Sequence, residues 1–282
     1  MGINGGTGIV GSGAALGGSG IHINRGGVAP FVGLLDLYPN AAAAYSVRLL
    51  KSDYAGSAME VRRSSDNALQ DIGFDANGDL DTASLLSFVG AGDGFVRTWY
   101  DQSGNANNAQ QTTSSRQPQI IATGVIYQLN SKPTIIAQPT RNWSFSAISS
   151  NLYSLFTTHY KTGTGNQAII GNGFTNYLWL DYQLNQFIAS GASIPIANTF
   201  AINTQYTYNA IAENTVGAEI FRNNISIGTR VTGYTGNDIT EFPYRTLRTA
   251  NLHLQETIIY SSNESSNREG IELNINNYFS IY

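Results

Sequence analysis

The sequence contains no cysteine among its 282 residues. Thiolate metal sites, iron–sulfur clusters, thiol nucleophiles and disulfide bonds are therefore excluded. Histidine is also scarce, and His22, His159 and His253 lie too far apart for metal-ligand spacing. We expect no metal and no cofactor.

Charged side chains make up only 12% of the residues, and the formal net charge is -4. Nucleic-acid binding needs clustered Lys and Arg, so we expect no nucleic-acid partner. No apolar run reaches about 18 residues, which excludes a membrane-spanning helix. The neutral, hydrogen-bonding composition suits uncharged polar ligands or packing against identical copies, so we expect a homo-oligomer.

Glycine is abundant at the N-terminal end, with eleven glycines in residues 1–30. Small apolar residues are interleaved with them, which leaves two interpretations open: a free linker, or a segment that orders when it docks on a partner. The first residues lack the basic start and apolar core of a signal peptide. We interpret residues 1–35 as an attachment arm and expect an extracellular location reached by another route, or inside a larger particle.

Beyond residue 108, short β-like runs recur with turn residues between them, and this spacing favours an all-β sandwich over residues 36–282. A further strand is expected at Met59–Arg63. The runs are Gln119–Ile126, Pro133–Ile136, Leu152–Tyr160, Gln167–Ile170, Tyr177–Tyr182, Gln205–Ala212, Ala218–Phe221 and Leu252–Tyr260.

Two short helices are expected beside the strands. Asn40 can cap a helix through the following alanine run. Ser265 or Ser266 can cap a second helix, in which Ile271 and Ile275 share one face with Tyr278.

The most informative motif is the run from Trp99 to Asn108, in which an apolar strand passes directly into an acidic-amide turn. Asp and Asn side chains in such turns bond their own backbone, and Gly104 supplies a positive φ. We predict a rigid surface loop at one end of the sheet. For Asp101 two roles stay open, capping this turn and binding a sugar hydroxyl.

Three blocks of sequence together resemble one family. They are Ala43-Ala-Tyr-Ser-Val-Arg-Leu-Leu with Met59-Glu-Val-Arg-Arg-Ser-Ser-Asp66, then Thr98-Trp-Tyr-Asp-Gln-Ser-Gly-Asn-Ala-Asn107, then Tyr177-Leu-Trp-Leu-Asp-Tyr-Gln-Leu-Asn-Gln-Phe187. They look like the catalytic domain of glycoside hydrolase family 54, the α-L-arabinofuranosidases. The resemblance spans roughly residues 36–282 and is weak after about 190. It implies a concanavalin- or laminin-G-like jelly-roll sandwich, and the arrangement also resembles structural and tail proteins of bacteriophages.

The resemblance also implies where cleavage chemistry would lie. A retaining glycosidase needs a nucleophilic carboxylate and a general acid/base. At the matching strand Asp181 is kept, but the nucleophile position holds Gln183, whose neutral amide cannot form a glycosyl ester. The family's acid/base aspartate lies about eleven residues before a glutamate that matches Glu256, and residues 243–251 contain no acid. The family's paired cysteines are absent too, so we predict no catalytic residues.

The favoured hypothesis is therefore a non-catalytic virion protein, a capsid decoration, fibre or tail component. Residues 1–35 would contact other virion proteins, and the sandwich at the virion surface would bind cell-surface glycan. The predicted ligand-binding residues are Tyr100, Asp101, Tyr177, Trp179, Asp181 and Gln183. The alternative is an active arabinofuranosidase that uses Asp181 with Glu213, Glu219 or Glu256. A third hypothesis is an architectural protein without any ligand.

Overall fold

A computed structural model describes the chain over ten ranges: 30–138, 140–163, 167–171, 177–181, 186–189, 192–195, 201–213, 216–230, 239–242 and 251–282. Residues 1–29 of the predicted arm lie outside these ranges, so the arm and its boundary remain predictions. The helices are α1 (Leu34–Leu37), α2 (Thr82–Val89), the 3-10 helix η1 (Ser114–Arg116) and α3 (Arg268–Phe279). Over the described ranges, no helix is long and apolar enough to cross a membrane.

Strands make up far more of the described chain than helices do. The first strands are β1 (Ala43–Ser46), β2 (Met59–Arg63), β3 (Leu69–Ile72), β4 (Gly94–Trp99), β5 (Ala109–Gln110), β6 (Gln119–Ala122), β7 (Val125–Ile126), β8 (Gln128–Leu129), β9 (Lys132–Pro133), β10 (Ile135–Ala137) and β11 (Trp143–Ile148). The later strands are β12 (Leu152–Thr162), β13 (Gln167–Gly171), β14 (Tyr177–Asp181), β15 (Gln186–Ala189), β16 (Ala192–Pro195), β17 (Gln205–Glu213), β18 (Gly217–Arg222), β19 (Ile225–Arg230), β20 (Ile239–Phe242), β21 (Asn251–Leu254) and β22 (Glu256–Tyr260). These confirm the predicted all-β sandwich.

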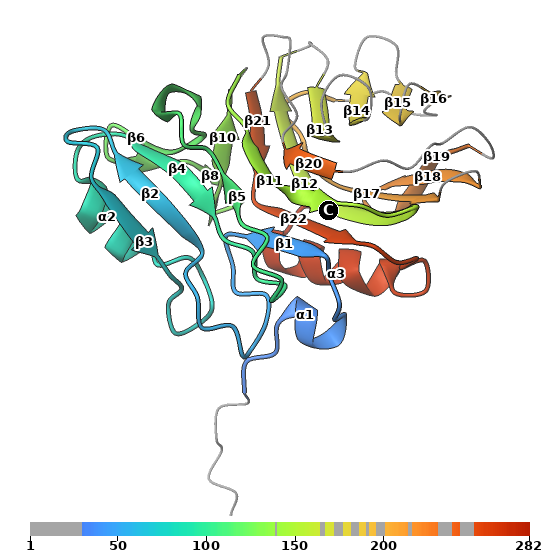
Figure 1. The fold of residues 1–282 in the computed structure, drawn as a ribbon, viewed down its shortest axis with the longest axis horizontal. Helices are drawn as coiled ribbons and strands as arrows, with labels where there is room; N and C mark the ends of the chain where they lie inside the picture. Colours follow the sequence, from blue (N-terminus) through green and yellow to red (C-terminus); the bar gives the residue numbers. More distant parts are fainter. Residues whose placement is uncertain are drawn as a thin grey trace, which may run out of the picture. The chain divides into compact units, whose positions relative to one another are not determined.

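The strands form two layers joined through β4, and all the described pairings are antiparallel (Figure 1). One layer runs β1–β22–β12–β17–β18–β19, with α3 along its outer side. The other runs β11–β20–β13–β14–β15–β16. Strand β4 pairs with β5, which leads to β11, and with β6, which leads through β10 and β21 to β12. On its other edge β4 pairs with β2 and, beyond it, β3.

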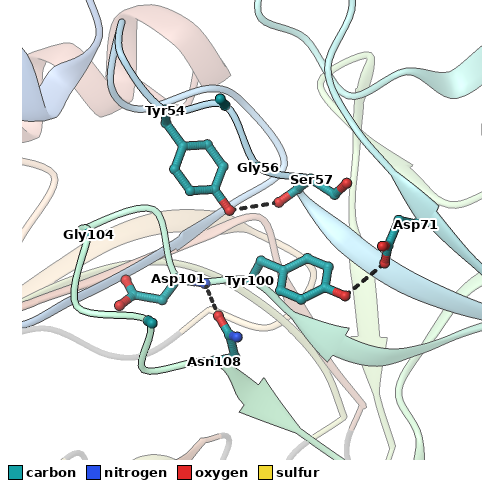
Figure 2. Close-up of a pocket in the computed structure, with 10 residues that line it drawn as sticks. Tyr54, Gly56, Ser57, Asp71, Tyr100, Asp101, Gly104 and Asn108 are labelled. Atoms are coloured by element: carbon teal, nitrogen blue, oxygen red, sulfur yellow. Dashed lines mark hydrogen bonds between the residues drawn. The ribbon is translucent and has the colours of Figure 1, made fainter.

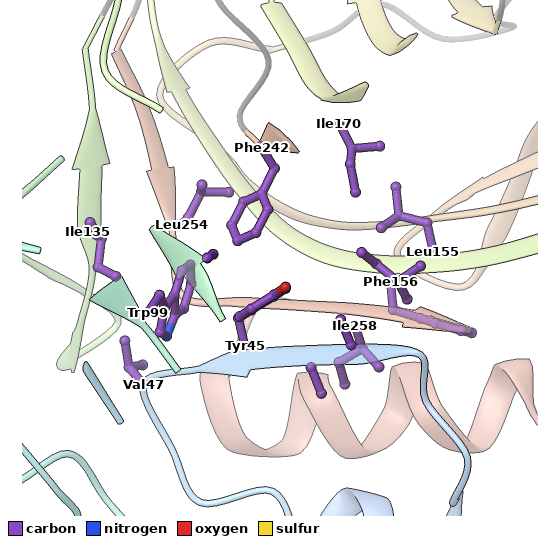
Figure 3. Close-up of a cluster of buried hydrophobic side chains, with 14 of the residues drawn as sticks. Tyr45, Val47, Trp99, Ile135, Leu155, Phe156, Ile170, Phe242, Leu254 and Ile258 are labelled. Carbon is purple, nitrogen blue, oxygen red and sulfur yellow. The ribbon is translucent and has the colours of Figure 1, made fainter. Parts of the chain in front are cut away.

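An aromatic cluster fills the space between the layers (Figure 3). Tyr45 of β1 packs 4.9 Å from the ring of Phe242, and Trp99 packs 5.4 Å from the ring of Trp143. Both indoles also donate hydrogen bonds, the Trp99 Nε1 to the Ser46 carbonyl and the Trp143 Nε1 to the Val96 carbonyl. The polar atoms of the buried rings are therefore satisfied, as close packing in a dry core requires.

The predicted helix through the alanine run is wrong. Residues Ala43–Ser46 form β1, every side chain of which is buried, and they pair with β22 from Ala43 opposite Ile259 to Ser46 opposite Glu256. Asn40 has a φ of 69°, which is not the conformation of a helix N-cap. Burial of four small or aromatic side chains in a central strand outweighs the helix propensity of alanine.

The C-terminal helix is confirmed, and Ile271 and Ile275, predicted to share one of its faces, are both buried. Its N-cap is Asn267 rather than Ser265 or Ser266, and the Asn267 side chain makes no capping bond. The sequence interpretation also missed α2, although Asp81 caps it through a side-chain bond to the Ser84 amide.

A buried ion pair joins the segment after β1 to the start of β22 and contacts α3. The Arg48 guanidinium meets the Glu256 carboxylate with Nε 2.7 Å from Oε2 and Nη2 2.9 Å from Oε1. Ser46 donates a third hydrogen bond to Oε2, and the Tyr278 ring of α3 lies 4.7 Å from the guanidinium carbon. Glu256 is fully buried, so its charge is tolerated only because these donors replace water.

His159 of β12 is completely buried in the same interior. Its ring packs edge-on against Tyr208 at 5.3 Å, and among the described residues neither ring nitrogen has a hydrogen-bond partner. Burial, with help from the nearby Lys161, lowers the pKa of His159 to about 3. The imidazole is therefore held neutral in the folded protein.

Removing one partner of the buried ion pair should be costly. We expect Arg48→Met to lower the free energy of unfolding by about 3–5 kcal/mol, because it leaves the Glu256 carboxylate buried without a countercharge. Adding Glu256→Met should recover most of that loss. Urea denaturation checks both, with Lys51→Met as the control, since the Lys51–Asp53 pair is exposed and worth at most about 1 kcal/mol. Equal losses in the single and double variants would contradict this account.

The buried histidine should make stability depend on pH. The folded pKa of His159 is lower than the ordinary value of 6.5, so the unfolded chain binds the extra proton, and stability falls as pH decreases below about 6.5. Between pH 6.5 and 5 the loss from this group is about 2 kcal/mol. Thermal or urea unfolding at both pH values should show a smaller difference for His159→Phe than for the wild type. An unchanged difference would mean that the imidazole takes up its proton in the folded state.

Candidate functional site

Asp101 organises the loop between β4 and β5. Its Oδ1 accepts hydrogen bonds from the amides of Ala44 (2.8 Å) and Ser103 (2.9 Å). Its Oδ2 accepts from the Ser103 hydroxyl (2.8 Å) and from the Asn107 amide (3.0 Å). With four donors on a buried carboxylate, Asp101 caps the turn and fixes it to β1.

The rest of the loop is held by its own asparagines. Asn105 donates its side-chain amide to the carbonyl of Ala41, and Asn107 donates to the carbonyl of Ser146. The Tyr45 hydroxyl donates to the Asn107 carbonyl at 2.5 Å, and Gly104 takes a φ of 96°. The predicted rigid surface loop is therefore present, anchored on two neighbouring segments.

A hollow of about 560 Å³ opens beside this loop (Figure 2). Tyr54 and Tyr100 contribute their rings, and Asp71 and Asn108 contribute polar groups. The Tyr100 hydroxyl donates to Asp71 Oδ1 at 2.7 Å, and the Tyr54 hydroxyl donates to the Ser57 carbonyl at 2.9 Å. Asn108 accepts from the Asp101 amide through its Oδ1 at 3.0 Å.

Both tyrosines stay protonated in this setting. Burial raises the pKa of Tyr54 to about 12, with a contribution from the carboxylates of Asp101 and Asp71. Burial and the hydrogen bond to Asp71 raise the pKa of Tyr100 well above its ordinary value. The hollow therefore combines two neutral phenols with negative charge, and none of the residues that line it is cationic.

The predicted ligand-binding residues do not form one site. Tyr100 and Asp101 follow β4, whereas Tyr177, Trp179 and Asp181 belong to β14 in another part of the sheet. Strands β5, β11, β20 and β13 lie between β4 and β14 along the pairings. Gln183 lies outside the described residues. A ligand-binding role for these side chains remains a prediction.

The structure also places the carboxylates considered as partners for Asp181. Glu256 is committed to Arg48. Glu213 and Glu219 lie on the α3 side of β17 and β18, because Thr207 and Asn209 of β17 bond Glu272 of α3 and alternate residues share a face. Figure 1 shows β14 on the other side of this layer. Glu213 and Glu219 therefore lie on the opposite side of this layer from β14.

Tyr54, Asp71 and Asn108 were missed as candidate site residues. No sequence signal could find Asp71 or Tyr54, because the pairing of β2 with β3 and the loop before β2 bring them together. Asn108 belongs to the singled-out loop, but its amide is aimed by the Asp101 backbone. In the described part of the chain, no group of three His, Asp or Glu side chains could hold a metal ion.

Comparison with known proteins supports one family over part of the chain. The sequence model described as "Alpha-L-arabinofuranosidase B, catalytic" matches residues 36–159, fewer than half of the 282 residues. No curated protein sequence matches the chain.

Three solved structures of arabinofuranosidases share the fold. A mutant family 54 α-L-arabinofuranosidase soaked with 4-nitrophenyl α-L-arabinofuranoside superposes with a TM-score of 0.68 at 14% identity. An arabinofuranosidase complexed with arabinofuranosyl-α-1,2-xylobiose gives 0.63 at 16%, and a family 54 enzyme soaked with a cyclic sulfate inhibitor gives 0.67 at 13%. Each match covers 83% of this chain and 62% of the other, so the chain spans less than two thirds of their length.

These matches contradict the favoured hypothesis of a non-catalytic virion protein and the prediction that the chain is not an enzyme. The matching sequence model is that of a catalytic domain, and the matching structures are glycoside hydrolases rather than virion components. The prediction treated the neutral Gln183 and the missing acid in residues 243–251 as decisive, whereas the preserved scaffold carries the match. The chain therefore carries a β-sandwich like that of the catalytic domain of glycoside hydrolase family 54 α-L-arabinofuranosidases.

Proposed function

We propose that the protein is a glycoside hydrolase that acts on α-L-arabinofuranosides. The observation that carries this proposal is the match of residues 36–159 to the catalytic-domain sequence model. The likeness of the sandwich to solved arabinofuranosidases supports the scaffold rather than the chemistry, because the identities are only 13–16%.

Hydrolysis of a glycoside needs two carboxyl groups, one to protonate the leaving oxygen and one to act as nucleophile or base. Most described carboxylates already serve the fold: Glu256 pairs with Arg48, Asp101 caps its loop, and Glu272 receives bonds from β17. Glu213 and Glu219 face α3. Outside these, the sequence from 172 to 250 contains Asp181, Asp238 and Glu241.

We propose that two of these three acids form the reacting pair. Gly171 of β13 lies opposite both Glu241 of β20 and Tyr177 of β14. Asp181 is four residues from Tyr177, about 13 Å along β14, so Asp181 and Glu241 do not lie directly opposite each other. The sequence interpretation missed Glu241, because it searched at the family's spacing before Glu256.

The test is release of 4-nitrophenol from 4-nitrophenyl α-L-arabinofuranoside by the purified protein. We expect two of the variants Asp181→Asn, Asp238→Asn and Glu241→Gln to lower kcat about 100-fold or more, because a positioned general acid or base contributes about 10²–10⁴ in rate. Glu219→Gln, on the α3 face, is the matched control and should retain full activity.

Two outcomes would count against this proposal. Hydrolysis that survives all three substitutions would reject the assignment of the reacting pair to these acids. A wild-type protein that releases nothing, while Gln183→Glu does, would show a hydrolase scaffold that has lost its chemistry, and the proposed function would be wrong.

A further inference from the structure

The hollow beside the Asp101 loop is separate from strands β14 and β20, which carry Asp181 and Glu241. It lies between the loop that carries Tyr54, strand β3 with Asp71, and the residues that follow β4. Along the strand pairings, β5 and β11 lie between β4 and β20, and β13 lies between β20 and β14 (Figure 1). Whatever occupies this hollow does so away from Asp181 and Glu241.

Its aromatic walls are fixed in place. Tyr54 and Tyr100 each donate their hydroxyl hydrogen to the protein, which anchors both rings and leaves an oxygen lone pair as an acceptor (Figure 2). Phe74 packs edge-on to Tyr54 at 6.4 Å. At Gly56 an added Cβ would lie 2.5 Å from the Tyr54 hydroxyl oxygen, so a glycine there leaves room for the ring.

Two polar groups in the hollow have bonding capacity to spare. Asp71 is exposed, and only its Oδ1 receives a hydrogen bond from the described residues, so Oδ2 can accept another. Asn108 uses its Oδ1 on the Asp101 amide, and its side-chain nitrogen has no acceptor among the described residues. Asp101 itself is saturated by its four donors. The hollow thus offers one strong acceptor, weaker phenolic acceptors and one amide donor.

The groups that line the hollow exclude several classes of ligand and fit a sugar. An anion would be repelled by Asp71, and an apolar ligand would leave Asp71 and Asn108 buried without partners. An ammonium group has donors only and cannot use the Asn108 amide nitrogen. A sugar hydroxyl both donates and accepts, and the C–H face of a sugar ring packs on an aromatic face.

We propose that this hollow is a second carbohydrate-binding site, which holds a neutral sugar unit of the polysaccharide at a distance from the cleavage site. Its volume is within the usual range for small-ligand pockets. Tyr54 and Tyr100 contact the ring faces, Asp71 accepts from a hydroxyl, and Asn108 donates to one. The proposal rests on the proposed function only in taking the ligand to be carbohydrate.

Calorimetric titration of the Asp181→Asn protein with arabinofuranosyl-α-1,2-xylobiose tests it without turnover. We expect saturable binding that weakens about tenfold in Tyr54→Ala, which removes one stacking face, and about tenfold in Asp71→Ala, which removes the acceptor. Asp66→Ala, an exposed acid in the turn between β2 and β3, is the matched control and should bind like the parent.

Tyr54→Ala also removes a contact with Phe74, which could prevent the variant from folding. Asp71→Ala leaves that contact in place and therefore tests the proposal independently. Unchanged affinity in Asp71→Ala, or tighter binding of choline chloride than of the oligosaccharide, would overturn the proposal. Sugar binding that depends on Asp71 in a protein without hydrolase activity would reject the proposed function and support this binding site. Hydrolysis without Asp71-dependent binding would support the proposed function and reject this binding site.

Discussion

One carboxylate, that of Asp101, joins the parts of this protein that matter for function. Its oxygens accept from β1, from its own turn and from the end of the loop, so this one residue ties the chain after β4 to β1. That loop places Tyr100 beside Asp71 on one side. On the other side it covers the Tyr45 hydroxyl and hence the aromatic cluster. The interior and the surface hollow thus share one anchor.

Local sequence patterns predicted much of the fold, and they failed where distant partners decide the outcome. The alternation in Met59–Arg63 predicted β2 with its observed bounds, because successive side chains of a strand point to opposite faces of the sheet. Ala43–Ser46 has a composition that favours a helix, but pairing with β22, more than 200 residues later, makes it a strand. The run Leu252–Tyr260 divides at Gln255, whose side chain bonds the carbonyls of Lys132 and Pro133.

The candidate site shows the same division. The role of Asp101 as a turn cap follows from its neighbours in the motif, because Asx turns are local. The proximity of Tyr54 and Asp71 does not follow from local sequence. It depends on the pairing of β2 with β3 and on a loop without regular structure. The likeness to a catalytic domain was visible in the sequence blocks. The neutral Gln183 at the family's nucleophile position does not exclude other acids, and strands β14 and β20, which carry Asp181 and Glu241, both pair with β13.

The pairing of β1 with β22 has a consequence for how the protein is made. During synthesis Ala43–Ser46 emerges long before Glu256–Tyr260. The apolar side chains of β1 therefore stay without their β22 partner strand while about 200 residues are added. Contacts of such long sequence separation slow folding and leave unpaired strand edges exposed to aggregation. The ribosome must therefore release nearly the entire described chain before the sandwich can close. Folding of this protein is expected to be largely post-translational and sensitive to chaperone supply.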